Sequence, residues 1–185
     1  GPMGRDEAGA LLVQARSDFR VFKLLLAQDR DVVAECHPLH YLQMAGEKLG
    51  KAARKGLDGS ESGSLSHVAF SKLPKLLRRR DCALALGWDS FDSYQQFLRQ
   101  SAPLIRQIET LNPAVGPGAG PPTGWPNVEY PWRLPGACEP GGWTAPAEYG
   151  FGIVDRFHHP EGRQLIVFVE RLIDRFDAVF DAATA

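Results

Sequence analysis

Arg30 and His37, with six residues between them, carry side chains that can cleave a phosphodiester. Near neutral pH a histidine can move a proton to or from a ribose 2′-hydroxyl, and an arginine can stabilise the charge that develops on the phosphate. The pair therefore has the chemistry needed for RNA cleavage. A structural interpretation is also open: Arg30 would be a solvated residue between two helices, and His37 would help the chain enter the second.

A possible set of metal ligands surrounds the same histidine, because Cys36, His37 and His40 fall within two turns of a helix. Side chains three apart share a helix face, and thiolate and imidazole are zinc ligands. The set is incomplete, and one of three distant histidines would have to complete it: His67, His158 or His159. Since no second paired ligand motif is present, the sequence predicts neither a metal nor a cofactor.

Five cations gather within nine residues and could meet phosphates: Lys72, Lys75, Arg78, Arg79 and Arg80. Residues 47–80 carry nine Lys and Arg against three Asp and Glu, whereas 139–181 carries eight acidic residues against four Arg. The cations could instead be a solvated helix end that favours the C-terminal dipole. Because one stretch is basic and the other is acidic, the chain could also associate with itself through these two stretches or dock to a charged partner.

Aromatic residues are spread through a proline- and glycine-rich stretch, and four of them are candidates for a partner surface: Tyr130, Trp132, Trp143 and Tyr149. Such side chains give a large contact area at low entropy cost and can also stack on nucleobases. The alternative is that these rings hold the long segment against the rest of the protein. A structural role is favoured for three residues of the second helix, Glu47, Lys48 and Lys51. They are expected to pair internally and cover the surface of the bundle, rather than to form a nucleotide pocket.

Periodic apolar residues predict the helices that must position these groups. Spacings of three and four predict a first helix along Leu11–Leu26 and a second that follows Pro38 and stops at Gly56. Ser66 is expected to cap a short third helix through Leu77, which Pro74 limits or kinks. The fourth is expected to begin near Ser90, bend at Pro103 and end at 112–113, and the last covers 164–181.

Between these helices, residues 113–162 show no sustained period, and we expect an ordered but irregular excursion before the last helix. The predicted fold class is therefore all-α, an antiparallel four- to five-helix bundle forming one domain over residues 4–185. Residues 1–3 are interpreted as a tag-cleavage scar, because Gly1-Pro2 precedes Met3.

Composition narrows the class of protein. The formal net charge is −1, so bulk charge does not point to nucleic acid or a membrane. No apolar run approaches the roughly 20 residues needed to span a bilayer, so we expect no membrane partner. Three widely spaced cysteines give no disulfide framework, which favours a reducing cytoplasm.

The second helix resembles the HEPN superfamily of helical domains (higher eukaryotes and prokaryotes nucleotide-binding). Residues 40–52 read HYLQMAGEKLGKA; an amphipathic helix with Ala15, Asp18 and Phe19 precedes them, and Ser66-His67-Val68 follows. The resemblance implies either a metal-independent RNase or a non-catalytic domain that binds nucleotides, RNA or partner proteins. The RNase motif, an arginine, a polar residue and a later histidine, matches at Arg30-Asp31 and His37, but the family usually places it in a late helix.

The resemblance and the displaced motif together predict a non-catalytic HEPN-like binding or accessory module of a bacterial defence or toxin–antitoxin system. It would engage a partner protein from the same locus, a nucleotide or RNA. The alternative is a dimeric metal-independent RNase that uses Arg30 and His37, with two sites meeting across the dimer. The sequence leaves open the ligand, the oligomeric state and the role of residues 113–162.

Overall fold

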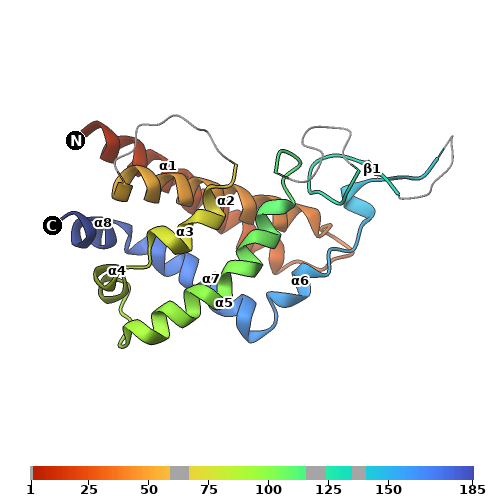
Figure 1. Cartoon of the computed structure of the whole chain (residues 1–185). Helices are drawn as coiled ribbons and strands as arrows, with labels where there is room; N and C mark the ends of the chain where they lie inside the picture. The colour runs from red at the N-terminus through yellow and green to blue at the C-terminus, as the bar shows by residue number, and fades with distance from the viewer. Residues whose placement is uncertain (1, 59–66, 116–123, 135–140) are drawn as a thin grey trace.

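The structure is a computed structural model that describes residues 2–58, 67–115, 124–134 and 141–185, and helix makes up 69% of it (Figure 1). It confirms the predicted predominance of helix. Within the described ranges there are more helices than the four or five expected: α1 Pro2–Leu26, α2 Cys36–Asp58, α3 Ala69–Leu76, α4 Arg80–Ala85, α5 Phe91–Thr110, α6 Ile153–Arg156, α7 Pro160–Asp174 and α8 Phe176–Thr184.

Helices α1 and α2 are antiparallel, because Asp18 pairs with Lys48, whereas Glu7, nearer the start of α1, pairs with Lys55, nearer the end of α2. Their apolar stripes face each other. The predicted core positions of both helices are buried, among them Phe22. The predicted stop at Gly56 is wrong, since α2 continues to Asp58. Gly56 instead provides space: a Cβ there would lie 2.6 Å from the ring of Phe180.

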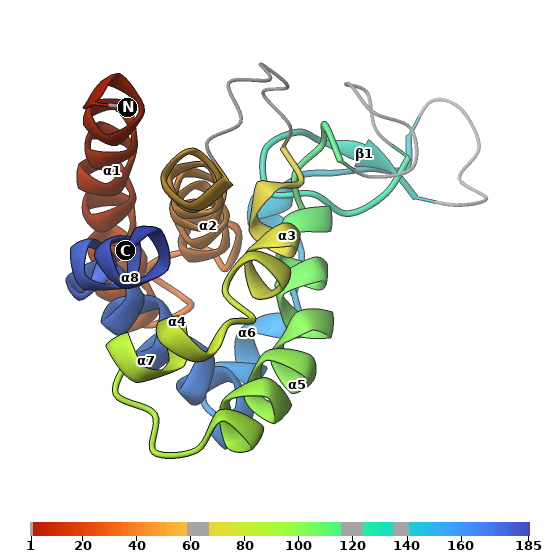
Figure 2. The same cartoon turned by 60° about the vertical axis from the view of Figure 1, so that its left-hand side comes forward.

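Helix α3 lies between α2 and α5 (Figure 2). Its expected cap, Ser66, lies outside the described residues, and Pro74 is accommodated inside the helix. Ser90 caps α5 as predicted, because its side chain accepts a hydrogen bond from the backbone N–H of Ser93. The Tyr94 hydroxyl donates to the Leu77 carbonyl at 2.8 Å, which ties the start of α5 to the end of α3.

The single last helix predicted over 164–181 is wrong, because the chain forms α7 and then α8. Arg175, at φ −109° and ψ 15°, separates them. The apolar stripe continues through Ile173, Phe176 and Val179, all buried, so the hydrophobic period did not reveal the break. Helix α8 packs against α4, a short helix that the sequence did not predict.

The stretch expected to be irregular, 113–162, contains only short regular elements in its described parts, so most of what the structure describes there is ordered without regular structure. Trp132 pairs with Thr144, and Arg133 with Trp143, in an antiparallel ladder. These elements span only two to four residues, too few to give a period, and helix α7 begins at Pro160 inside the expected stretch. The elements are β1 Trp132–Arg133, β2 Trp143–Thr144, the 3-10 helix η1 Pro146–Glu148 and α6.

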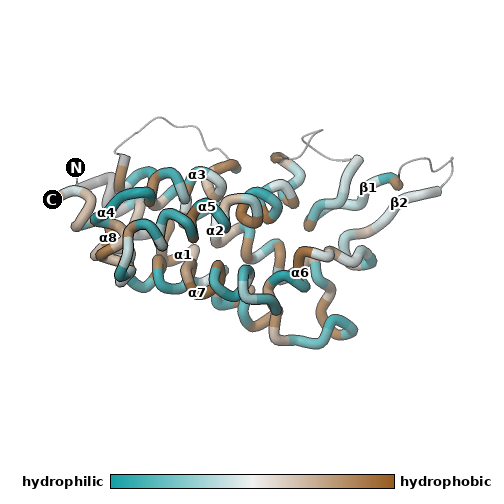
Figure 3. Tube along the Cα trace, turned by 60° about the horizontal axis from the view of Figure 1, so that its bottom comes forward, coloured by the Kyte–Doolittle hydropathy of each residue, from teal (hydrophilic) through white to brown (hydrophobic). Residues whose placement is uncertain are grey.

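Hydrophobic and hydrophilic residues alternate along the helices, as expected for amphipathic helices that each turn one face to a shared core (Figure 3). Buried side chains from α1, α2, α3, α5 and α7 belong to one cluster, and Trp132 and Phe151 join it from the long excursion. None of the helices in the described ranges is both long and apolar enough to cross a membrane.

Candidate functional site

Arg30 is held by two carboxylates. Its guanidinium lies 2.9 Å from Glu35 and also pairs with Asp155 of α6, which draws the connection between α1 and α2 toward α6. The hydrogen bond from Arg30 lowers the pKa of Asp155. His37 is exposed, and no side-chain contact joins it to Arg30 within the described residues. The structure therefore does not assemble the two predicted RNase residues into a shared site.

The suggested metal ligands are also dispersed. Cys36 is buried, and burial raises the pKa of its thiol. His40 turns toward the long excursion, where its Nδ1 lies 3.5 Å from the Glu129 carboxylate. Across the described part of the chain, no three His, Cys, Asp or Glu side chains are placed to hold a metal.

The predicted phosphate-binding cations separate into two groups. Arg79 is engaged: it donates to both carboxylate oxygens of Asp81 and to the Ala183 carbonyl at 3.0 Å. The other four are exposed, and the guanidinium of Arg80 lies 5.4 Å from the centre of the Phe91 ring. Lys72, Lys75 and Arg78 have no acidic partner among the described residues.

The four candidate aromatic residues lie in two environments. Trp132 is buried, and the half-buried Tyr149 packs edge-on against it at 5.0 Å. Tyr130 and Trp143 are 41% and 49% exposed. The Arg133 guanidinium lies 5.4 Å from the Trp143 ring centre. Two rings therefore fix the excursion to the core, while the other two remain on the surface.

Glu47 and its neighbours form the internal pairing expected from sequence. Glu47 pairs with Lys51, and His67 Nδ1 lies 3.3 Å from its other carboxylate oxygen. Burial alone would raise the pKa of Glu47, but the hydrogen bonds from Lys51 and His67 hold the pKa below its ordinary value. Lys48 turns to α1 and pairs with the buried Asp18 at 2.6 Å.

The lowered pKa of Glu47 predicts a pH dependence. A carboxyl group whose folded-state pKa is depressed stabilises the fold above its unfolded pKa, about 4.3, and this contribution disappears as pH falls through the folded value. Glu47→Gln should therefore cost about 1 kcal/mol at pH 7 and progressively less as the pH falls below about 4.3. Urea unfolding of both proteins at several pH values measures the difference, and a constant gap across this range would contradict the prediction.

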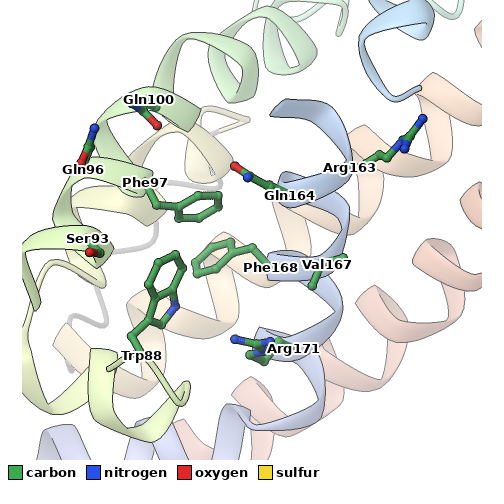
Figure 4. Close-up of a pocket in the computed structure, with 10 residues that line it drawn as sticks. All are labelled: Trp88, Ser93, Gln96, Phe97, Gln100, Arg163, Gln164, Val167, Phe168 and Arg171. Carbon is green, nitrogen blue, oxygen red and sulfur yellow. The ribbon is translucent and has the colours of Figure 1, made fainter. Parts of the chain in front are cut away.

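A cleft of about 510 Å³ lies between α5 and α7. The lining residues of α5 are three, one and three positions apart along the chain, so they lie on one face of that helix. Those of α7 are one, three, one and three positions apart and likewise share one face. Trp88, in the connection between α4 and α5, closes one end (Figure 4). The helical lining residues are Ser93, Gln96, Phe97, Gln100, Arg163, Gln164, Val167, Phe168 and Arg171.

Three aromatic rings make the apolar wall of this cleft. The ring centres of Trp88 and Phe97 are 5.3 Å apart, and those of Phe97 and Phe168 are 4.9 Å apart. Gly87, at φ +78°, makes the turn that presents Trp88, a backbone conformation that favours glycine. The indole N–H of Trp88 is buried and has no acceptor within the described residues.

Polar side chains surround the aromatic wall. The amides of Gln96, Gln100 and Gln164 have no partner within the described ranges. Arg163 donates to the His158 carbonyl, and Arg171 to the Leu86 carbonyl at a long 3.4 Å. The contact with Leu86 uses one of the five N–H groups of the Arg171 guanidinium, which points toward Trp88 and keeps donors for an anion, whereas the Arg163 guanidinium points away from the rings (Figure 4).

The chemistry of the cleft is that of recognition. Rings can stack on a flat group, glutamine amides can both donate and accept, and guanidinium groups can bind an anion. None of its ten lining residues is a His, Cys, Asp, Glu or Lys, so the lining offers no conventional acid–base pair. This arrangement can bind and orient a ligand.

The sequence prediction missed this cleft. Phe97 and Phe168 lie one position from residues of the predicted stripes, Leu98 and Val169, and would have been treated as widening them. The available signal was an aromatic residue among glutamines, as in Gln96-Phe97 and Gln100. That signal becomes specific only when α5 and α7 are known to be neighbours.

No protein-family model, no curated protein sequence and no solved structure matches this chain. The resemblance of residues 40–52 to HEPN domains therefore stays a prediction from sequence. The function must be inferred from the residues of the cleft and from the surfaces around it.

Proposed function

We propose that the chain is a non-catalytic binding module whose α5–α7 cleft takes a flat, ring-bearing anion, with mononucleotides as the first class to test. The observation that carries this proposal is the combination of an aromatic wall with the guanidinium of Arg171 and no conventional acid–base pair in one cleft. A volume of about 510 Å³ falls within the range of small-molecule sites.

Each part of the cleft has a role in this proposal. The ring of the ligand stacks against the half-buried Trp88, an interaction worth about 1–3 kcal/mol for a nucleobase. The glutamine amides pair with polar atoms on the edge of the ring. Arg171, whose guanidinium points toward Trp88 (Figure 4), holds the anionic group through charged hydrogen bonds worth roughly 1.5–3 kcal/mol.

The wider role remains the one that the sequence predicts. We propose a HEPN-like antiparallel helical bundle that serves as an accessory module in a bacterial defence or toxin–antitoxin system. The HEPN-like second helix supports this assignment, and the cleft supplies a binding function that needs no catalytic residues. A protein from the same locus or a second copy of the chain would recognise the module with its ligand bound.

Calorimetric titration tests the binding proposal. Adenosine 5′-monophosphate should bind, adenosine should bind about tenfold more weakly because it lacks the anion, and inorganic phosphate alone should not bind measurably. Arg171→Gln should weaken binding of the monophosphate about tenfold. Arg20→Gln, an exposed cation of α1 outside the cleft, is the matched control and should leave the affinity unchanged.

Two results would overturn this proposal. The first is equal affinity for the parent and for Arg171→Gln, which would place the nucleotide elsewhere. The second is RNA cleavage by the parent protein that His37→Ala abolishes, because that outcome would make the chain a ribonuclease. The engagement of Arg30 by Glu35 and Asp155 leads us to expect no such cleavage.

A further inference from the structure

A second surface of the molecule, separate from the cleft, carries concentrated positive charge. Helix α3 contributes Lys72 and Lys75, with Arg78 following it, and α5 contributes Arg99 and Arg106. All five are exposed. No acidic partner for any of them is found within the described residues. Together with Arg80 we call these residues the basic face.

The packing of α3 against α5 places these cations side by side. The backbone N–H of Ser71 donates to the Glu109 carboxylate at 3.1 Å, while the Tyr94 hydroxyl reaches the Leu77 carbonyl. The two helices are therefore antiparallel neighbours, as Figure 2 shows. The contact made by Glu109 identifies the flank of α5 that borders α3.

Helical geometry puts the α5 arginines on that flank. Arg99 and Arg106 are seven residues apart, so they lie on nearly the same line along the helix, and Arg106 lies less than one turn from Glu109. Gln96 and Gln100, which line the cleft, lie on the other flank. Neighbouring helix axes are about 8–10 Å apart, so the cations of α3 and α5 form two adjacent rows.

The acidic residues of α3 and α5 do little to neutralise these rows. Helix α3 contains none, and α5 contains Asp92 and Glu109. Glu109 is only 3% exposed and is hydrogen-bonded to Ser71, while Asp92 lies in the first turn at one end of the arginine row. The basic face is therefore open for a polyanion.

The composition of the face indicates which polyanion it fits. Protein interfaces are centred on buried aromatic or apolar anchors, and single-stranded nucleic acids stack their bases on exposed rings. In the described part of the chain, none of the large apolar side chains that are exposed belongs to α3 or α5. A duplex backbone requires neither kind of anchor and binds through cations.

We infer that the basic face binds the phosphate backbone of a nucleic-acid duplex without reading its sequence. Lys72, Lys75, Arg78, Arg99 and Arg106 make the phosphate contacts, and Arg80, placed over Phe91, extends the row. Arg79, although predicted from sequence as part of the site, is already engaged by Asp81 and the Ala183 carbonyl.

Fluorescence anisotropy with labelled duplexes of 20 base pairs, one of RNA and one of DNA, tests the inference. Both should bind, and affinity should fall steeply with salt. Lys75→Gln/Arg99→Gln, which removes one cation from each row, should weaken binding about tenfold at low salt and reduce the salt slope by roughly 2. The control Arg20→Gln/Lys55→Gln removes the same charge from α1 and α2 and should leave most of the binding intact.

The outcomes separate this inference from its rivals and from the nucleotide proposal. Absence of duplex binding, or equal loss in both double variants, would overturn it. Tighter binding of a labelled polyglutamate peptide than of either duplex would assign the face to an acidic protein and also overturn it. Arg171→Gln should bind duplex as the parent does, so failure of the cleft proposal would leave this result unaffected.

Discussion

Replacing Lys48 with methionine is expected to lower the free energy of unfolding by about 3 kcal/mol. Lys48 Nζ donates to Asp18 across the α1–α2 interface at 2.6 Å, and the Asp18 side chain is only 4% exposed. Without the ammonium group, the carboxylate keeps a single side-chain donor among the described residues, the Gln14 amide at 2.9 Å. A buried charge left without its counter-ion accounts for the size of the expected loss.

The double variant Asp18→Leu/Lys48→Met distinguishes this explanation from lost packing alone. It removes both charges and fills the space with apolar atoms, so its stability should return to within about 1 kcal/mol of the parent. Urea unfolding followed by circular dichroism measures all three proteins. A double variant as unstable as Lys48→Met would show that the ion pair is not the cause.

A second large effect is expected from Gly50→Ala, which should destabilise the protein by about 2 kcal/mol. A Cβ at Gly50 would lie 2.3 Å from the Ala69 carbonyl oxygen, a backbone atom at the start of α3 that cannot move aside cheaply. Overpacking costs about 1–3 kcal/mol and opposes the gain of about 1 kcal/mol that alanine brings to a helix. At this position the steric cost dominates.

Gly9→Ala is the matched control, because a Cβ at Gly9 would meet nothing within 4 Å. The same substitution should there raise stability by up to about 1 kcal/mol through helix propensity. Thermal and urea unfolding of the two variants should therefore shift in opposite directions. A gain in stability for Gly50→Ala would contradict the close approach of α2 and α3.

The long helices were predictable because their local signals agree. In α1 the spacing of Ala15, Phe19 and Phe22 defines one buried face, and in α5 the Ser90 cap coincides with the start of the apolar period. Prediction failed where one residue type can serve two structural purposes. Gly56 resembles a helix stop, but its missing side chain makes room for Phe180.

The functional surfaces were less predictable, because they depend on which helices are neighbours. Phe97 and Phe168 are 71 positions apart in the chain and meet only when α5 packs beside α7. The basic run was visible in the sequence, but its extension to Arg99 and Arg106 required the contact between Ser71 and Glu109. The local sequence pattern predicted the helices, whereas the two candidate sites depend on how those helices pack.

Helix α5 connects the two proposed sites. One flank supplies Gln96, Phe97 and Gln100 to the cleft, and the flank beside α3 supplies Arg99 and Arg106 to the basic face. A module built in this way could hold a small anionic ligand and a duplex backbone on two sides of one helix. The two binding events remain separable by substitution, because no residue belongs to both surfaces.

The indole resonance of Trp88 gives the most direct test of the cleft. The chain has four tryptophans, and Trp88→Phe assigns the peak in a proton–nitrogen correlation spectrum. During titration with adenosine 5′-monophosphate, the Trp88 indole peak should shift saturably, while that of the exposed Trp143 stays in place. An unmoved Trp88 peak at millimolar nucleotide, or a saturable shift of Trp143 alone, would contradict a ligand site between α5 and α7.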